Sequence, residues 1–155
     1  MDKKILLMNI ENGELLDEIK ALLQRRGYEP TLASEPDDKN SIIDKKITRI
    51  FIALGISAKL KGYIFLREAI KFTIEEPDII NNVTTKLYPK VAALCDSDPK
   101  KVERDIRNAI ETAWSRGKLK NLNSLFGMQV YGNYDKPTNS EFIALIADKI
   151  MLDSL

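Results

Sequence analysis

Histidine is absent from the 155 residues, and cysteine occurs once, at Cys95. Without an imidazole the chain lacks the usual proton shuttle at neutral pH, and the cysteine has no histidine to activate it. Zinc sites built from histidine and cysteine are excluded for the same reason, and one cysteine cannot close an internal disulfide. The sequence therefore argues against an enzyme, a bound metal or a cofactor, and the lone thiol fits a reducing cytoplasm.

Long apolar runs and glycine-rich loops are also missing. No run approaches the roughly 20 residues that span a bilayer. The short apolar stretch at the N-terminus meets acidic residues at once and has no small-residue cleavage site, so it is no signal peptide. The 7 glycines are scattered rather than gathered in a phosphate-binding loop. We expect no membrane contact and a cytoplasmic location.

The composition is that of one ordinary folded domain with a small appendage, because 44% of the residues are hydrophobic and 30% are charged. The net charge of +1 is unevenly distributed. Residues 1–40 carry 6 Lys/Arg against 9 Asp/Glu, whereas residues 99–120 carry 7 against 3. A local basic patch of this kind can follow phosphates even when the total charge is small.

The first 33 residues have the pattern of a β-α-β segment. Lys3–Ile10 is a continuous apolar run, Glu14–Arg26 has leucines at helical spacing, and Tyr28–Ala33 favours a second short strand. Two strands and one helix cannot cover both faces of the first strand, so a second copy of the chain or the rest of this one must do so. The polar residues 34–40 are the expected linker.

Residues 41–155 have an almost wholly helical pattern. Asp98 before Pro99 is a strong helix start, and Thr138 with Glu141 has the spacing of a capping box. We predict a bundle of about six helices, with the expected segments being Ser41–Leu54 with Ser41 as its cap, Gly62–Thr73, Ile79–Leu87, Pro89–Leu94, Pro99–Arg116 and a last helix opened by Thr138, while Leu122–Phe126 is a further short helix or a turn. The fold class is therefore mainly α, preceded by a short β-α-β segment.

The order of a short apolar helix, a tight polar turn and a long basic helix is typical of a helix-turn-helix. The helix predicted over 99–116 places apolar residues on one face and polar residues on the other, namely Lys100, Lys101, Glu103, Arg104, Arg107 and Asn108. Arginine can bind guanine, glutamate can accept from cytosine, and asparagine can pair with adenine. The alternative is a solvated face with ion pairs such as Glu103 with Arg107. DNA recognition requires Glu103, Arg104 and Arg107 to lie outward, free of partners within the chain.

Several segments make the chain similar to a known family. They are Gly62-Tyr-Ile-Phe-Leu-Arg-Glu-Ala-Ile70, Leu87-Tyr-Pro89, Val102-Glu-Arg104, Ile106-Arg107, Ala109-Ile-Glu111, Ala113-Trp-Ser-Arg-Gly117, Ser124-Leu-Phe-Gly127 and Pro137-Thr-Asn-Ser-Glu-Phe-Ile-Ala144. From about Ile47 onward the chain resembles the DNA-binding effector domain of the master sporulation response regulator of endospore-forming bacteria. The resemblance implies a helical bundle around a helix-turn-helix that reads a short G·C-containing box in double-stranded DNA, often in tandem copies. The sigma subunit of RNA polymerase is a candidate partner.

The resemblance also implies roles for individual residues. Glu103, Arg104 and Arg107 would read bases, with Lys101 and Asn108 beside them and Lys100 adjacent, while the turn at Ser97 would approach phosphate. Asn108 stands where the family commonly has histidine, so the preferred DNA sequence is expected to be related but not identical.

The N-terminal segment departs from the family pattern, which has a full receiver domain there. Residues 1–33 resemble only the first strand, helix and second strand of a receiver, Ile10-Glu11 stands where its acidic pair would fall, and the phosphate-accepting strand is missing. We therefore expect a regulator that is independent of aspartyl phosphorylation and dimeric through residues 1–33. The alternative is an interaction protein that pairs with a full-length regulator or a kinase-side partner, or that occupies the DNA sites without activating.

Overall fold

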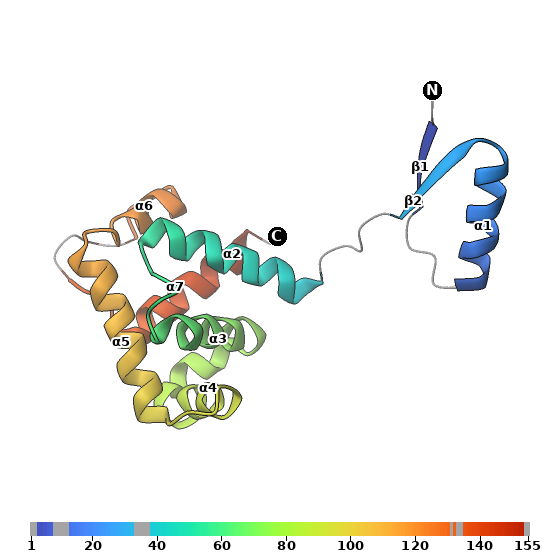
Figure 1. The fold of residues 1–155 in the computed structure, drawn as a ribbon. Coiled ribbons are helices and arrows are strands. Elements are labelled where there is room, and N and C mark those ends of the chain that lie inside the picture. Colours follow the sequence, from blue (N-terminus) through green and yellow to red (C-terminus); the bar gives the residue numbers. More distant parts are fainter. Residues whose placement is uncertain (1–2, 8–12, 33–37, 131, 133–134, 154–155) are drawn as a thin grey trace. The chain divides into compact units, whose positions relative to one another are not determined.

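The computed structural model describes all residues except 1–2, 8–12, 33–37, 131, 133–134 and 154–155 (Figure 1). The chain forms two compact units, residues 1–42 and residues 43–155. Helices make up most of the second unit, so the prediction of a mainly α protein is confirmed. Most of the predicted linker over 34–40 lies outside the described residues, and its last two residues already belong to a helix.

The first unit contains a two-stranded parallel sheet and one helix. Strand β1 (Lys3–Leu7) pairs with β2 (Tyr28–Leu32), with Lys3 opposite Tyr28 and Leu7 opposite Leu32. Helix α1 (Gly13–Arg25) connects the strands and packs against β2. It ends before Gly27, whose φ of +78° is a left-handed conformation that glycine adopts without strain. No residue of α1 is buried.

Among the described residues, six α-helices build the second unit, and the first of them begins four residues before it. These are α2 (Lys39–Leu54), α3 (Gly62–Glu75), α4 (Tyr88–Leu94), α5 (Pro99–Ser115), α6 (Asn121–Phe126) and α7 (Asn139–Leu152). A 3-10 helix (Pro77–Asn82) and a π-helical turn (Val83–Leu87) lead into α4.

Two sequence predictions about these helices are wrong in detail. Ser41 does not cap α2, because the helix begins at Lys39 and the carboxylate of Asp38 accepts a hydrogen bond from the Ser41 backbone N–H at 2.7 Å. The single helix predicted over Ile79–Leu87 is instead the 3-10 and π segments. Pro89 has no N–H and its ring crowds the carbonyl four residues earlier, which explains why the chain widens here and the Tyr88 N–H bonds to the Val83 carbonyl, five residues back.

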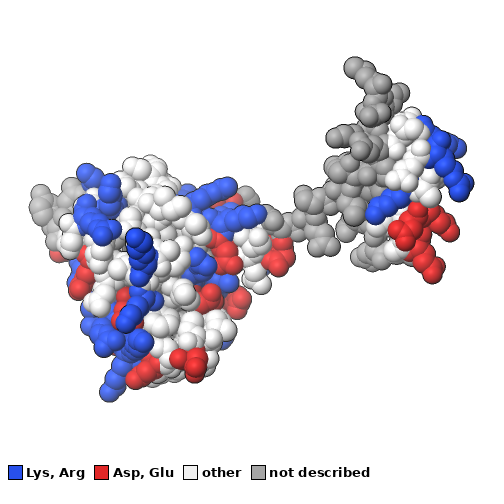
Figure 2. Space-filling model, in the orientation of Figure 1, with Lys and Arg blue, Asp and Glu red and all other residues white. Residues whose placement is uncertain are grey.

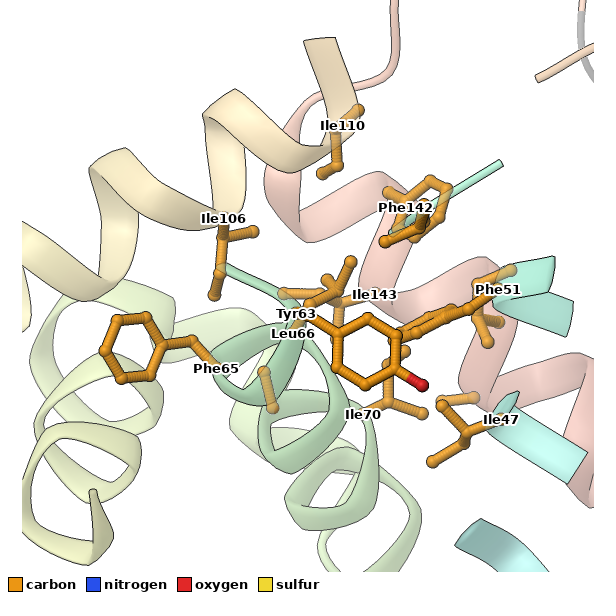
Figure 3. Packing of buried hydrophobic residues seen from close by; sticks show 14 of the residues in the cluster. Ile47, Phe51, Tyr63, Phe65, Leu66, Ile70, Ile106, Ile110, Phe142 and Ile143 are labelled. Carbon is orange, nitrogen blue, oxygen red and sulfur yellow. The ribbon is translucent and has the colours of Figure 1, made fainter. Parts of the chain in front are cut away.

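The core of the second unit lies around α3, which contacts both α5 and α7. Figure 3 shows Tyr63 and Leu66 of α3 among Ile106 of α5, Phe142 of α7 and Phe51 of α2. The rings of Phe51 and Tyr63 meet edge to face, with centroids 5.2 Å apart. Helices that are distant in sequence therefore share one apolar centre, and this centre fixes the inner face of α5.

The first residue of α3 sets how closely α3 approaches α5. A Cβ atom on Gly62 would lie 2.0 Å from the backbone carbonyl oxygen of Asp105 in α5. Only a residue without a side chain allows this approach of the two backbones, because no other residue leaves the space empty. Gly62 thus acts as the contact point that positions the middle of α5.

Candidate nucleic-acid interface

A tight turn joins α4 to α5. After α4 ends, Asp96 takes a left-handed φ of +51°, and the Ser97 N–H donates to the Ala92 carbonyl at 2.8 Å. Aspartate tolerates the left-handed region better than most residues, and this bond closes the free end of α4. The predicted order of short helix, polar turn and long helix is therefore present in the structure.

The start of α5 follows the capping rule expected from the sequence. The Asp98 side chain accepts from the Lys100 backbone N–H at 3.0 Å, and Pro99 occupies the first helical position. A carboxylate at this point satisfies one of the unpaired N–H groups of the first turn and interacts favourably with the helix dipole. The cap therefore fixes where α5 begins and in which direction it leaves the turn.

The inner face of α5 is almost fully buried. Val102, Ile106, Ala109, Ile110 and Ala113 have between 0% and 1% of their surface exposed. Asp105 is also buried, at 7% exposure, although its charge argued against burial. Asp105 lies three residues after Val102 and four before Ala109, on the side of α5 that α3 approaches.

The outer face of α5 carries the residues that the sequence singled out. Lys100, Lys101, Arg107 and Asn108 are exposed, and the Arg104 side chain keeps 63% of its surface accessible. Figure 2 shows basic side chains gathered over the end of α5 where the helix begins. Glu103 is half-buried, with 39% of its side chain exposed. The structure thus brings the predicted base-reading residues together on one accessible face.

The expectation that Glu103, Arg104 and Arg107 are free of intramolecular partners is wrong. Glu103 accepts a hydrogen bond from the Arg107 guanidinium one turn later, and the Nε atom of Arg104 lies 3.4 Å from a carboxylate oxygen of Asp105. An exposed ion pair between residues i and i+4 contributes only about 0.3–0.5 kcal/mol. The contact between Glu103 and Arg107 therefore orients these side chains but holds them too weakly to keep them from a stronger ligand, whereas the partner of Arg104 is a buried carboxylate.

Ser97 does not offer its hydroxyl to the surface. The Oγ atom is buried and has no hydrogen-bond partner within the described part of the chain, and the backbone N–H is already bonded to Ala92. The expected contact of Ser97 with phosphate is not supported by this geometry. The start of α5, with Lys100 and Lys101 exposed, is the better position for a phosphate contact.

A residue outside the helix-turn-helix anchors α5. The side-chain amide of Asn139 donates to the Glu103 backbone carbonyl and to the Tyr88 hydroxyl, both at 3.1 Å. Burial raises the pKa of Tyr88, and the hydrogen bond from Asn139 opposes that shift. Sequence reasoning placed Asn139 in a helix start but missed this bridge from α7 to α4 and α5.

A cavity of about 600 Å³ opens beside this bridge. It is lined by residues of α5, of the loop before α7 and of the segment before α4, among them Glu103, Arg107, Lys136 and Asn139. Lys136 lies 2.5 Å from a carboxylate oxygen of Glu111, and this hydrogen bond, together with the positive charge, holds the pKa of Glu111 below its ordinary value. The polar face of α5 is therefore continued by polar residues from the loop before α7.

Residues 47–150 match the model of the family described as Sporulation initiation factor Spo0A C terminal. The chain belongs to this family. The match runs from within α2 to the last turn of α7, and it identifies this unit as the DNA-binding domain of a sporulation regulator. No helix in the described ranges is both long and apolar enough to cross a membrane.

Proposed function

We propose that the chain is a sequence-specific transcription regulator that reads a G·C-containing box in double-stranded DNA through the outer face of α5. The observation that carries this proposal is the face itself. Arg104 and Arg107 project from a helix whose opposite side is buried in the core of the domain. A rigid helix with accessible arginines near its start is what a major-groove reader requires.

Each residue of this face has a distinct role in the proposal. Arg104 and Arg107 present guanidinium groups to guanine, and Glu103 either accepts from cytosine or keeps Arg107 extended through their hydrogen bond. Asn108 lies one position after Arg107 and can pair with adenine or a phosphate. Lys100 and Lys101 flank them at the helix start, where both the charge and the helix N-terminus attract phosphate.

The proposal extends to the control of the protein. Ile10-Glu11 replaces the acidic pair of a receiver, and residues 8–12 lie outside the described part of the chain. We infer activity that is independent of aspartyl phosphorylation, with residues 1–33 joining two copies in a dimer. Two linked domains on tandem boxes would gain affinity because the second binds at a high effective concentration. Such a regulator would act in the cytoplasm, with the sigma subunit of RNA polymerase as a candidate partner.

Binding of the full chain to a G·C-box duplex and to a scrambled duplex tests the proposal. Arg104→Ala is expected to weaken binding to the box by about 1–3 kcal/mol and to change binding to the scrambled duplex much less. Arg49→Ala, an exposed arginine of α2, is the matched control and should leave the preference intact. Equal losses on both duplexes for Arg104→Ala would reduce the residue to a phosphate contact and contradict base reading.

A second candidate function rests on the first unit. Helix α1 has no buried residue, and Leu15 and Leu22 are 47% and 49% exposed, which suits a protein-interaction module. In this alternative the chain pairs with a full-length regulator or occupies its DNA sites without activating. Co-purification with such a partner, combined with no preference for the box duplex, would favour it over direct regulation.

A further inference from the structure

The outer face of α1 carries two leucines that the first unit does not cover. Leu15 and Leu22 are 47% and 49% exposed, whereas Leu16, Ile19 and Leu23 are half-buried. Residues seven apart lie on the same side of a helix, since two turns take 7.2 residues. The two leucines therefore form one exposed apolar row, beside the apolar residues that α1 turns toward its own unit.

The charges beside this row are of opposite sign, so that those of one copy of α1 can pair with those of another copy. Glu18 and Arg25 each follow one of the leucines by three residues, so both lie along the same edge of the row. Neither makes an ion pair with any described residue. Helix α1 has acidic residues in its first half and arginine in its last turn, and Figure 2 shows the acidic side chains together at one end of the helix.

We propose that α1 packs antiparallel against α1 of a second copy, about a two-fold axis that passes beside Leu22. This proposal rests on the dimer of the proposed function and names its interface. In an antiparallel pair the same edges of the two helices meet, so Glu18 of each copy faces Arg25 of the other. A parallel pair would bring opposite edges together, so Glu18 and Arg25 would face the edge that carries Ile19 and Leu23 and would gain no oppositely charged partner. The charges therefore select a second copy as the occupant and also its direction.

Disulfide trapping tests the position of the axis in the full chain, with Cys95 changed to serine. Leu22→Cys lies beside the axis and should form an intermolecular disulfide under mild oxidation. Leu15→Cys is the matched control because it is equally exposed but lies about 10 Å from the axis along the helix, at 1.5 Å per residue. Its two copies would then be about 20 Å apart, well beyond the roughly 7 Å that a disulfide can bridge. Equal trapping of both variants, or trapping of neither, would overturn the proposal.

Charge reversal tests the pairing without relying on new cysteines. Glu18→Arg or Arg25→Glu alone turns two attractive contacts into two repulsive ones, and we expect each to weaken dimerisation about tenfold in sedimentation equilibrium. The double variant E18R/R25E restores both contacts and should recover the original dimer. A double variant as weak as the single variants would contradict the antiparallel arrangement.

The DNA readout separates this proposal from the DNA-binding proposal. Leu22→Glu should give a monomer that still prefers a single G·C-box duplex over a scrambled one, because α5 is unchanged. If the original chain showed no preference for the box duplex while Leu22→Cys still formed the disulfide, only the DNA-binding proposal would be refuted. If the original chain were monomeric at all concentrations but still preferred the box duplex, only the proposed α1 interface would be refuted.

Discussion

The close approach of α3 to α5 at Gly62 makes a quantitative prediction about the Gly62→Ala variant. The new Cβ atom would lie 2.0 Å from the carbonyl oxygen of Asp105 and 3.1 Å from the backbone nitrogen of Ile106. The carbonyl oxygen would have to retreat from 2.0 Å to the ordinary contact distance of 3.4 Å. Because the obstacle is helix backbone, no side-chain rotation can relieve the overlap, and α5 itself must move.

The expected cost follows from two opposing effects. Overpacking a core costs typically 1–3 kcal/mol, and backbone against backbone belongs at about the upper end of that range. Replacing glycine with alanine in a helix interior returns up to about 1 kcal/mol, and less at the first helical position. We therefore expect Gly62→Ala to lower the free energy of unfolding by about 2–3 kcal/mol. In urea this corresponds to a midpoint lower by about 1–2 M, given the usual denaturant dependence.

Urea unfolding followed by circular dichroism measures this change, with Gly132→Ala as the control. A Cβ atom on Gly132 would meet no other atom within 4 Å. This variant is therefore expected to unfold at nearly the original midpoint. If the two variants had equal midpoints, the contact between Gly62 and α5 would not control the packing of this unit. A destabilised Gly62→Ala should also bind the G·C-box duplex less tightly, because α5 carries the residues that we propose to read bases.

Two further predictions concern the loop before α7. Asn139→Ala removes two hydrogen bonds and should lower the free energy of unfolding by about 1–3 kcal/mol, whereas the exposed Asn81→Ala should not; equal midpoints for both would contradict the bridging role. Lys136→Met removes the partner that lowers the pKa of Glu111. Because the pKa of the Glu111 carboxyl is lower in the folded state than in the unfolded state, its ionised form stabilises the fold at pH values above the pKa of the unfolded state. This stabilisation is lost as the pH falls through the pKa of the folded state. The variant should therefore be less stable than the original at neutral pH, and the difference should vanish in acid; a difference that persists in acid would assign the effect to packing.

The sequence predicted those parts of the fold that depend on neighbours along the chain. Asp98 before Pro99 and the Thr138 capping box marked helix starts, because a cap bonds to N–H groups within three residues. Helical spacing likewise identified the buried row of α5. Ser41 failed as a cap because α2 begins at Lys39, and Asp38, three residues earlier, accepts from the N–H of Ser41 itself. Two capping residues in one short stretch leave the start of a helix ambiguous.

The remaining features depend on contacts between segments that are distant in sequence. Asp105 lies on the buried face by spacing, three residues after Val102 and four before Ala109, but its charge argued for exposure and the covering helix α3 lies more than forty residues away. The bridge from Asn139 to Tyr88 and Glu103 joins residues 51 and 36 positions apart. The ion pair of Glu103 with Arg107 was foreseen as an alternative to DNA binding, and the structure contains it. The local sequence pattern suggested both a DNA-reading face and a solvated face with ion pairs, but it could not decide between these two interpretations.

That ion pair and DNA recognition are compatible once their energies are compared. The exposed pair contributes about 0.3–0.5 kcal/mol, whereas a bidentate contact of arginine with guanine is worth about 1–3 kcal/mol of discrimination. The proposed contact with guanine is the stronger of the two and would decide the position of Arg107 in the DNA complex, while the ion pair only keeps the side chain extended beforehand. The strong constraints act instead on the hidden side of α5, through Gly62, Asn139 and the buried aliphatic row. A helix whose backbone is fixed from behind and whose outer side chains are weakly held can exchange its own partners for bases without moving.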